Sequence, residues 1–410
     1  MLKAILYNLK KKGYAFMVQQ GGIWPTEKQE LLLRASLLQG QAALDAWRKW
    51  ETRVDVKELD HASRRLLPLF YRNLERQGIT FPVMDLYKGI YRLTWYENQM
   101  LFHAAASLLH AFHEAGIETI VLKGAVLALE YYKDPGLRPM GDFDVLIHPK
   151  NVLTAVSLLR SRGWLPKSGF PKEVKDQFFS ARHAHGFYDA AGHEFDLHWH
   201  VLAESCEKNA DDDFWNGAIR IQINDVLTYS LNPTDLFLHV CSHGLRWNNV
   251  PPFRWVADAM TILNTSSSKI DWDRLIVLSR RLHLVLPLQE ALRYLVDLLG
   301  AAIPQGVLRS LSRTPIPEEE RRFYKIRMQP MDTLSPYRML TLLYLRYSQA
   351  TYSGNSELSS ASFLRYLQML WGVDCLWQVP FYAVLKAIRR IWRSKLWRSN
   401  RLIRKLVHKE

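Results

Sequence analysis

Cysteine is scarce in this chain of 410 residues, which contains only Cys206, Cys241 and Cys375. Their spacing is not that of metal ligands, and an odd number of scattered cysteines does not form a disulfide framework, so we expect a reducing compartment. Long apolar runs are also missing: no stretch reaches roughly 18 uninterrupted apolar residues, which argues against a transmembrane helix. The first twelve residues have too short an apolar run for a signal peptide. These absences favour a cytoplasmic protein.

Three common enzyme motifs are absent as well. The sequence contains no P-loop pattern, no GxSxG nucleophile elbow and no GxGxxG dinucleotide fingerprint, so none of these enzyme classes competes for the interpretation. Material for a folded core is plentiful, because 48% of the residues are hydrophobic and 12% are aromatic. That composition argues against disorder, and the length is enough for two or three domains.

Positive charge is concentrated near the end of the chain. Residues 381–410 carry ten Lys and Arg against one Glu, which places +9 of the net +14 there. The same region alternates basic residues with aromatic and aliphatic ones, including Trp371, Trp377, Trp392 and Trp397. A basic tail of this kind is typical of a helix on a membrane surface, including the inner face of a cell membrane. It is also typical of a nucleic-acid contact or of a helix docked on the protein body with solvated arginines.

Apolar residues recur at helical spacing through most of the first hundred residues. The predicted helical segments there are residues 29–38, 43–54, 66–75, 86–108 and 99–115. Gly116 just past the last of them is a typical helix end. The pattern then changes to short β-branched runs separated by glycine and proline. Residues 117–200 read as β-α-β-α-β-β, with strands at 117–122 and 142–148, helices at 125–132 and 149–162, and a hairpin of 185–189 with 193–200.

Helical spacing returns at Asn232, which is a plausible N-cap with Pro233 in the first turn and Asp235 at the third position. We expect helices to about residue 311 and again over 336–349. The proline- and charge-rich residues 312–335 predict a connector, and the serine-rich residues 353–362 predict a linker.

Two aspartates open the second predicted strand. Asp142 and Asp144 lie two residues apart, so on a strand both side chains point to one face. An Asp-x-Asp is by itself also a common turn or strand cap. Here it follows a strand–glycine–helix unit, and Asp196 lies in a later strand with apolar flanks. A buried carboxylate needs a partner, and one shared divalent metal would satisfy all three. Carboxylates that hold a metal beside phosphate indicate phosphoryl or nucleotidyl transfer.

These motifs together resemble a known group of proteins. Leu122-Lys-Gly124, Arg138, Asp142-x-Asp144 and Phe195-Asp-Leu-His-Trp199 are similar to motifs of the DNA polymerase β-like nucleotidyltransferase superfamily, most closely its uncharacterised bacterial branch. The resemblance is best over residues 100–205.

A weaker resemblance covers residues 236–263, where the matching residues of that branch's helical region are His239, His243, Arg246, Trp247, Arg254 and Asp258. These residues form either a packed aromatic stripe with solvated arginines or the far wall of a nucleotide cleft.

The resemblance implies a role for each matching residue. Gly124 would be the glycine turn at a helix start whose backbone N–H groups bind triphosphate. The usual serine after it is Ala125 here, and Lys123 would replace the missing contact. Arg138 would clamp phosphate with its guanidinium.

Asp142 and Asp144 match the metal-binding pair of the superfamily. Asp196 matches the third carboxylate, which helps to hold the catalytic metal and activates the attacking hydroxyl. The implied cofactor is Mg²⁺, and the implied reaction moves a nucleoside monophosphate from an NTP to an acceptor with release of pyrophosphate. The acceptor is unknown: a small molecule, a sugar phosphate or a protein. Two alternatives remain open, namely a phosphotransferase using the same metal site, and a non-catalytic nucleotide-binding or membrane-associated assembly partner.

Several histidines near these carboxylates are candidate metal ligands. Asp196, His198 and His200 alternate on one strand face, which allows a zinc site, but three ligands along one straight strand spread too far for a single ion. We therefore prefer His198 as a residue behind the metal or in contact with phosphate. His239 and His243 are spaced i, i+4 but lack the glutamate of a metalloprotease motif, so we expect them in the core or the substrate cleft.

The predicted fold is α+β: a small mixed-sheet nucleotidyltransferase core flanked by helical regions. The expected segments are an N-terminal helical region over 1–100, the core over 101–230, a C-terminal helical region over 231–350, and a linker with a basic aromatic helical tail over 351–410.

Overall fold

The structure is a computed structural model that describes residues 23–167, 170, 176–206, 209–245, 252–329, 335–352 and 362–388. Arg246 and Trp247, the predicted linker from residue 353 to residue 361, and the basic tail beyond residue 388 lie outside the described residues.

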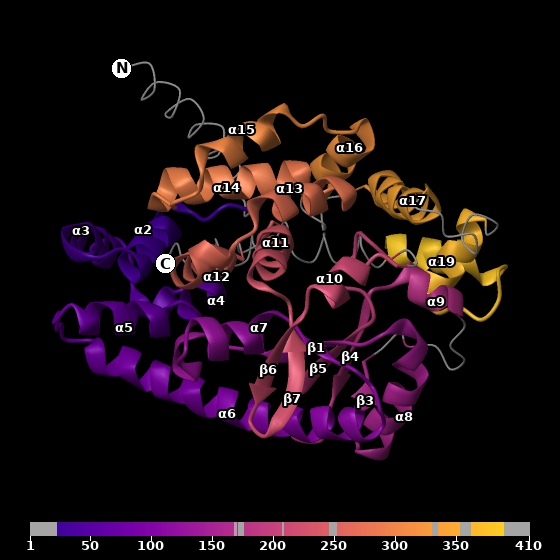
Figure 1. Cartoon of the computed structure of the whole chain (residues 1–410), viewed down its shortest axis with the longest axis horizontal. Helices are drawn as coiled ribbons and strands as arrows, with labels where there is room; N and C mark the ends of the chain where they lie inside the picture. Colours follow the sequence, from indigo (N-terminus) through magenta and orange to yellow (C-terminus); the bar gives the residue numbers. More distant parts are fainter. Residues whose placement is uncertain are drawn as a thin grey trace, which may run out of the picture.

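A seven-stranded mixed sheet lies in the lower half of the molecule as drawn in Figure 1, with strand order β3-β4-β5-β2-β1-β7-β6. Its two parallel pairings are β2 with β5 and β1 with β7, and the remaining neighbours are antiparallel. The strands are β1 Ile120–Val121, β2 Asp142–Leu146, β3 Leu165–Pro166, β4 Ala184–Tyr188, β5 Glu194–His198, β6 Ile219–Ile223 and β7 Val226–Ser230.

The sheet is larger than the sequence interpretation allowed. The predicted strands were all placed before residue 201, and the hairpin of β6 and β7, within the predicted core over 101–230, adds two more and places β7 parallel to β1. Ile219, Ile221 and Ile223 alternate with polar residues, which is the period of a half-exposed strand. Asn224 then adopts a φ of 52°, in the left-handed region that asparagine tolerates in a tight hairpin turn.

The N-terminal region is helical, as predicted. The helix α2 begins with a capping box between Thr26 and Gln29, in which each side chain accepts a hydrogen bond from the other residue's backbone N–H. The two segments expected over 86–108 and 99–115 form one continuous helix of 31 residues, α6. The helices are α2 Glu27–Leu37, α3 Gly40–Glu51, α4 His61–Arg64, α5 Leu67–Arg76 and α6 Met84–Glu114.

Short helices connect the strands of the sheet. After β1 the chain turns into α7, which continues as a π-helical turn, Leu127–Tyr131. Single π-turns are rare and recur at functional sites. The helices of this region are α7 Lys123–Val126, α8 Val152–Ser161, α9 Asp176–Ala181 and α10 Asp212–Asn216.

The C-terminal region begins as predicted, since Asn232 caps α11 by accepting the backbone N–H groups of Thr234 and Asp235. The predicted connector over 312–335 is wrong, because α16 lies within it. Its proline and charge suggested a loop, but the acidic first turn and the basic last turn stabilise a helix. The helices are α11 Pro233–Gly244, α12 Arg254–Ser266, α13 Trp272–Arg281, α14 Val285–Leu299, α15 Gln305–Arg313, α16 Glu318–Arg327, α17 Pro336–Tyr352 and α19 Phe363–Trp371.

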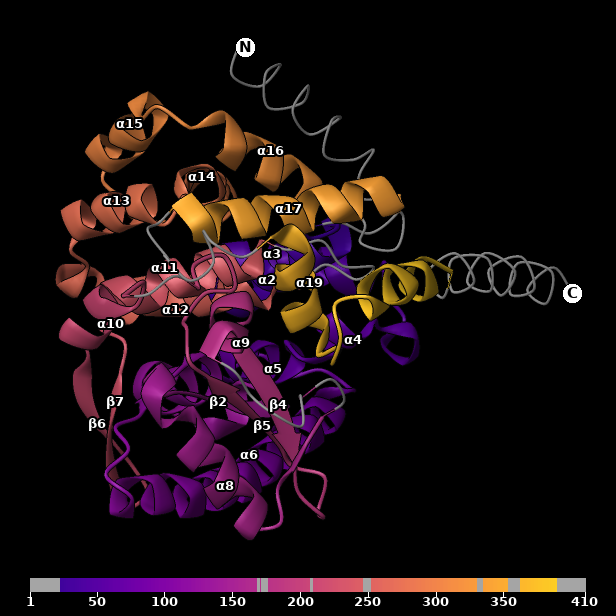
Figure 2. The same ribbon diagram turned by 90° about the vertical axis from the view of Figure 1, so that its right-hand side faces the viewer.

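One hydrophobic cluster runs from Ile23 through the sheet to Leu311. The helix α6 packs along the sheet, while α2 contacts α12 and α14, so the two helical regions meet beside the sheet (Figure 1). Figure 2 shows α17 and α19 on the face that this view turns toward the reader, where α19 packs on α17 and α9.

The predicted α+β class is confirmed, whereas the four segment boundaries stay a prediction. Within the described ranges, no helix combines the length and the apolarity needed to cross a membrane.

Candidate active site

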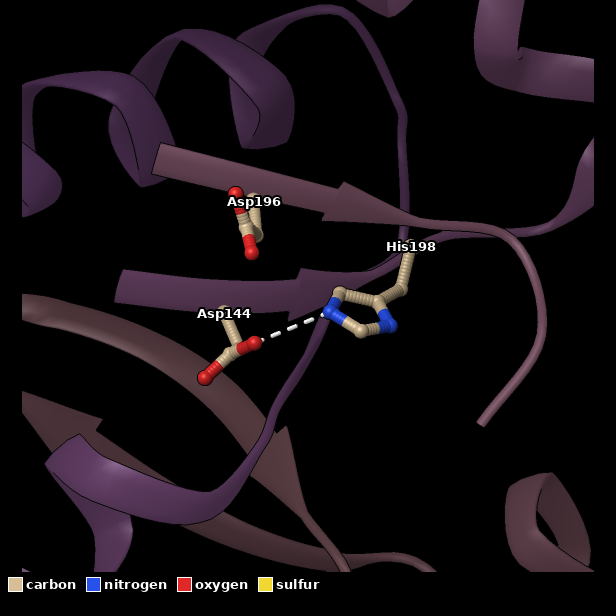
Figure 3. Close-up of side chains that lie close together, drawn as sticks. All are labelled: Asp144, Asp196 and His198. Atoms are coloured by element: carbon tan, nitrogen blue, oxygen red, sulfur yellow. Dashed lines mark hydrogen bonds and ion pairs between the residues drawn. The ribbon is translucent and has the colours of Figure 1, made fainter. Parts of the chain in front are cut away.

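Strand pairing brings three of the predicted site residues together. Because β2 and β5 run parallel with Asp144 opposite Asp196 and Leu146 opposite His198, the side chains of Asp144, Asp196 and His198 lie on one face of the sheet. Figure 3 shows the three side chains clustered beside these two strands. Each offers one ligand atom within 4.8 Å of the others. Among the described residues, this is the group of acidic, histidine or cysteine side chains that could hold a metal ion.

Asp144 is the most enclosed carboxylate of the group, with 5% of its surface exposed. Its Oδ1 accepts a hydrogen bond from Lys123 Nζ at 3.0 Å and pairs with His198 Nε2 at 2.9 Å. Burial acts to raise the pKa of Asp144, but the Lys123 ammonium and the His198 imidazole outweigh it and hold the pKa well below its ordinary value. Asp144 is therefore ionised at neutral pH.

Asp142 and Asp196 are less enclosed than Asp144, and their pKa values shift in the opposite direction. Burial, and next the negative charge of Asp144, raise the pKa of both carboxyl groups. A cation between the strands would remove this repulsion. The donor set also fits a divalent ion, since carboxylate oxygens and one imidazole are common metal ligands. Asp142 contributes charge but does not belong to the compact group of three.

The His198 ring is buried beside Asp144 and faces it with Nε2. It is 2% exposed, and its Nδ1 is buried without a hydrogen-bond partner among the residues that the structure describes. A buried polar atom left unsatisfied is costly and calls for an explanation. That atom lies on the side of the ring away from the carboxylates, because Nε2 is the nitrogen that faces Asp144 (Figure 3). The fit of a cation therefore rests on the short spacing of the ligand atoms of Asp144, Asp196 and His198.

Lys123 and Gly124 open α7 directly above this face. The backbone N–H of Leu122 donates to the Asp144 carbonyl at 3.0 Å, which fixes the turn to β2. Lys123 has a φ of 41°, a strained value for a residue with a side chain, and strain of this kind clusters at functional sites. A Cβ on Gly124 would lie 2.9 Å from Arg138 Nη1, so the close approach of the arginine requires glycine here.

Arg138 is buried against α12 and is not a free surface cation. Its Nε and Nη2 donate to Oδ1 and Oδ2 of Asp258, each at 2.9 Å, and the Tyr132 hydroxyl donates to Asp258 Oδ1 at 3.0 Å. Two of the three guanidinium nitrogens therefore donate to Asp258, while the third, Nη1, faces Gly124. Direct contact of Arg138 with phosphate stays a prediction.

The zinc alternative does not form in this structure. The strand β5 ends at His198, and the His200 ring turns to Asp211, with Nδ1 and Oδ2 2.7 Å apart. His200 thus pairs with Asp211 and does not join Asp196 and His198 in one group of ligand atoms. The rings of His239 and His243 lie 6.0 Å apart on α11, where His239 is buried, as expected for a core position.

Several neighbours of the site were not predicted. Gly186 on β4 faces Asp196, because a Cβ there would lie 2.9 Å from Asp196 Oδ1. Arg65, at the end of α4, lies close enough to oppose the rise in the pKa of Asp142, as do Lys123 and Arg254, both of which the resemblance had singled out. The alternation of β4 could have identified Gly186 as a place of close approach. No local signal marks Arg65, because it reaches the site only through the packing of the N-terminal helices.

A mixed sheet with helices at both ends, and with carboxylates paired across two parallel strands beside a glycine turn, defines a nucleotidyltransferase-like protein. Residues 59–300 match the family described as uncharacterised nucleotidyltransferase. The match covers more than half of the 410 residues, and the chain belongs to this family. It includes every predicted site residue, and Arg65 as well.

Among solved structures, the chain is similar to an antigenic nucleotidyltransferase-like protein from Paracoccidioides brasiliensis. The two share 17% identity over 53% of this chain and 93% of that one, with a TM-score of 0.31. That score is too low to support an argument about mechanism. No curated protein matches this chain.

Proposed function

We propose that the protein transfers a nucleoside monophosphate from an NTP to an acceptor and releases pyrophosphate, with Mg²⁺ as the cofactor. The observation that carries this proposal is the convergence of Asp144 and Asp196 from two parallel strands, with the ligand atoms of both within 4.8 Å of each other and of the His198 ring. Membership of the nucleotidyltransferase family supports it. Asp144 and Asp196 would supply oxygen ligands to the metal, and Asp142 adds negative charge at the edge of the group. His198, whose Nε2 pairs with Asp144, would orient that carboxylate.

A bound divalent ion would supply charge neutralisation at the phosphate oxygens. The protein's own residues orient and deprotonate. Lys123 has an ammonium beside Asp144 that can donate to phosphate oxygens, and Gly124 leaves its backbone open to close approach. In the reaction that we propose, the acceptor oxygen bonds to the α-phosphorus and the bond from phosphorus to pyrophosphate breaks. The acceptor proton would pass to Asp196, the carboxylate opposite Asp144 on the neighbouring strand.

The test is transfer of label from each α-³²P-NTP in the presence of Mg²⁺, with a cell extract as the acceptor pool. The wild-type protein should transfer label and release pyrophosphate, whereas Asp144→Asn should not. Asp225→Asn, in the exposed turn before β7, is the matched control and should behave like wild type. Transfer from γ-labelled NTP with release of a nucleoside diphosphate would favour the phosphotransferase alternative. Loss of nucleotide binding in every condition would reject both.

We also propose that the C-terminal helix contacts an anionic membrane surface. Residues 378–388 are helical, and Val379 packs inward beside Tyr366 and Leu367. The opposite face is an apolar stripe at helical spacing, each member at least 48% exposed: Trp377, Phe381, Val384, Leu385 and Ile388. An apolar stripe with Trp and Phe in a strongly basic segment is typical of a helix in a lipid interface. Localisation at the inner face of the membrane stays a prediction.

A further inference from the structure

Three arginines from distant parts of the chain meet beside Asp142. They are Arg65 at the end of α4, Arg138 in the loop before β2, and Arg254 at the first position of α12. Arg65 Nη2 and Arg254 Nη1 both donate to the backbone carbonyl of Pro139, at 3.0 and 2.5 Å. Two guanidinium groups therefore converge on one neutral oxygen.

The nearby carboxylates balance these positive charges only in part. Asp258 is fully used by Arg138 and Tyr132. Within the described part of the chain, no carboxylate lies within ion-pair distance of Arg65 or Arg254. Burial, followed by the charges of Arg138 and Arg65, lowers the pKa of Arg254 to about 9. Burial and the Arg138 charge also lower the pKa of Arg65. Three guanidinium groups thus face only Asp142 and Asp258 as acidic neighbours, which leaves an excess of positive charge. Enclosed cations in excess of their counter-charges are costly, so this arrangement favours an anionic ligand.

The position of the cluster restricts which anion it suits. Asp142 lies on one side, and Arg138 Nη1 points from the cluster toward Gly124, at the turn that opens α7. Guanidinium groups match phosphate oxygens in two-point hydrogen bonds, and a diphosphate carries enough negative charge to balance more than one of them.

We propose that Arg65 and Arg254 bind the β- and γ-phosphates of the nucleotide, the group that leaves as pyrophosphate. This inference rests on the proposed function, and it makes the N-terminal helices part of the active site. Arg138 is then a positioning residue that fixes the loop between the two ligand-binding arginines. A phosphorylated acceptor is the other source of the same chemistry, and the experiment below separates the two.

The test measures binding of inorganic pyrophosphate to the full chain by calorimetry without added metal. Wild type should bind pyrophosphate, and ATP should displace it. Arg65→Gln and Arg254→Gln should each weaken pyrophosphate and ATP binding roughly tenfold or more, because each loses a charge-assisted hydrogen bond. Arg65→Lys should restore part of the loss. The matched control is Arg220→Gln, which removes one exposed charge from β6 and should leave binding unchanged.

Two results would overturn the inference. Pyrophosphate binding at wild-type affinity in both glutamine variants would mean that the arginines only stabilise the fold. Pyrophosphate that ATP cannot displace would assign the cluster to a phosphorylated acceptor instead. Circular dichroism checks folding, and if Arg254→Gln fails to fold, the half-buried Arg65 decides the matter.

The proposed nucleotidyl transfer and the proposed pyrophosphate site can be tested independently of each other. Asp144→Asn should keep metal-free pyrophosphate binding while losing transfer of label. Pyrophosphate binding without any transfer by the wild type would contradict nucleotidyl transfer but leave the arginine cluster in place.

Discussion

Asp144 and Asp196 lie opposite one another on adjacent strands, but their surroundings move their pKa values in opposite directions. Lys123 and His198 keep Asp144 ionised, whereas burial and the charge of Asp144 raise the pKa of Asp196. This difference suits a division of work in which Asp144 is a permanent anionic ligand and Asp196 accepts a proton.

Asp196→Asn should stabilise the metal-free protein at neutral pH. Because the folded-state pKa of Asp196 is raised, its contribution to stability is fully present at low pH and is lost as the pH rises through the folded pKa. At neutral pH the ionised Asp196 therefore opposes folding, and asparagine removes that cost. We expect a higher melting temperature than wild type at pH 7, and little difference at pH values below the ordinary aspartate range. The measurement is thermal unfolding in chelator across pH.

The same variant should lose the increase in melting temperature that a divalent cation gives the wild type, since a ligand stabilises only the state that binds it. Asp225→Asn serves again as the control and should follow wild type throughout. A lower melting temperature for Asp196→Asn at pH 7 in chelator would contradict the electrostatic argument.

At the scale of secondary-structure elements, the Arg138–Asp258 pair connects the loop before β2 to α12. Both side chains are about 6% exposed, and the pair is bidentate. It determines how the C-terminal helices lie against the acidic strand.

Asp258→Asn should destabilise the protein by about 3–5 kcal/mol, because it leaves a buried guanidinium without its counter-charge. Urea unfolding measures this free energy. The comparison is Glu27→Gln, which removes the exposed pair of Glu27 with Arg53 and should cost less than about 1 kcal/mol. Equal, small losses in the two variants would show that the buried pair does not anchor α12.

Local patterns predicted the elements that carry the carboxylates. The strand with Asp142 and Asp144, the glycine turn at Gly124 and the strand of Asp196 are each encoded within a few residues. The parallel pairing of β2 with β5, which places Asp144 opposite Asp196, is long-range and was not predicted. The helix α16 was missed because proline and charge outweighed its weak apolar pattern. Arg65 could not be predicted, because its position depends on how α4 packs against a loop far along the chain.

At the scale of the whole molecule, the exposed stripe on residues 377–388 should bind vesicles that contain anionic lipid. Wild type should float with phosphatidylserine vesicles at low salt and much less with phosphatidylcholine vesicles, since headgroup charge attracts the basic segment. Phe381→Asp with Leu385→Asp should abolish flotation while leaving the fold intact, because both side chains are exposed. Flotation assays with matched protein concentrations measure this.

Leu227→Asp, at an exposed position on β7, is the control for added negative charge and should keep flotation. Equal flotation with neutral and anionic vesicles would contradict the charge argument. Retention on a polynucleotide, without flotation, would instead support the nucleic-acid alternative for the tail.

The two edges of the sheet limit how copies of the protein can associate. One edge is β3, which is two residues long and ends in Pro166, a residue without a backbone N–H. The other edge is β6, which carries the exposed charge of Arg220. Short, proline-containing or charged edges resist strand addition and the growth of fibrils. We therefore expect concentrated protein to avoid edge-to-edge aggregation through the sheet, so that any self-association in solution would originate in its helical surfaces.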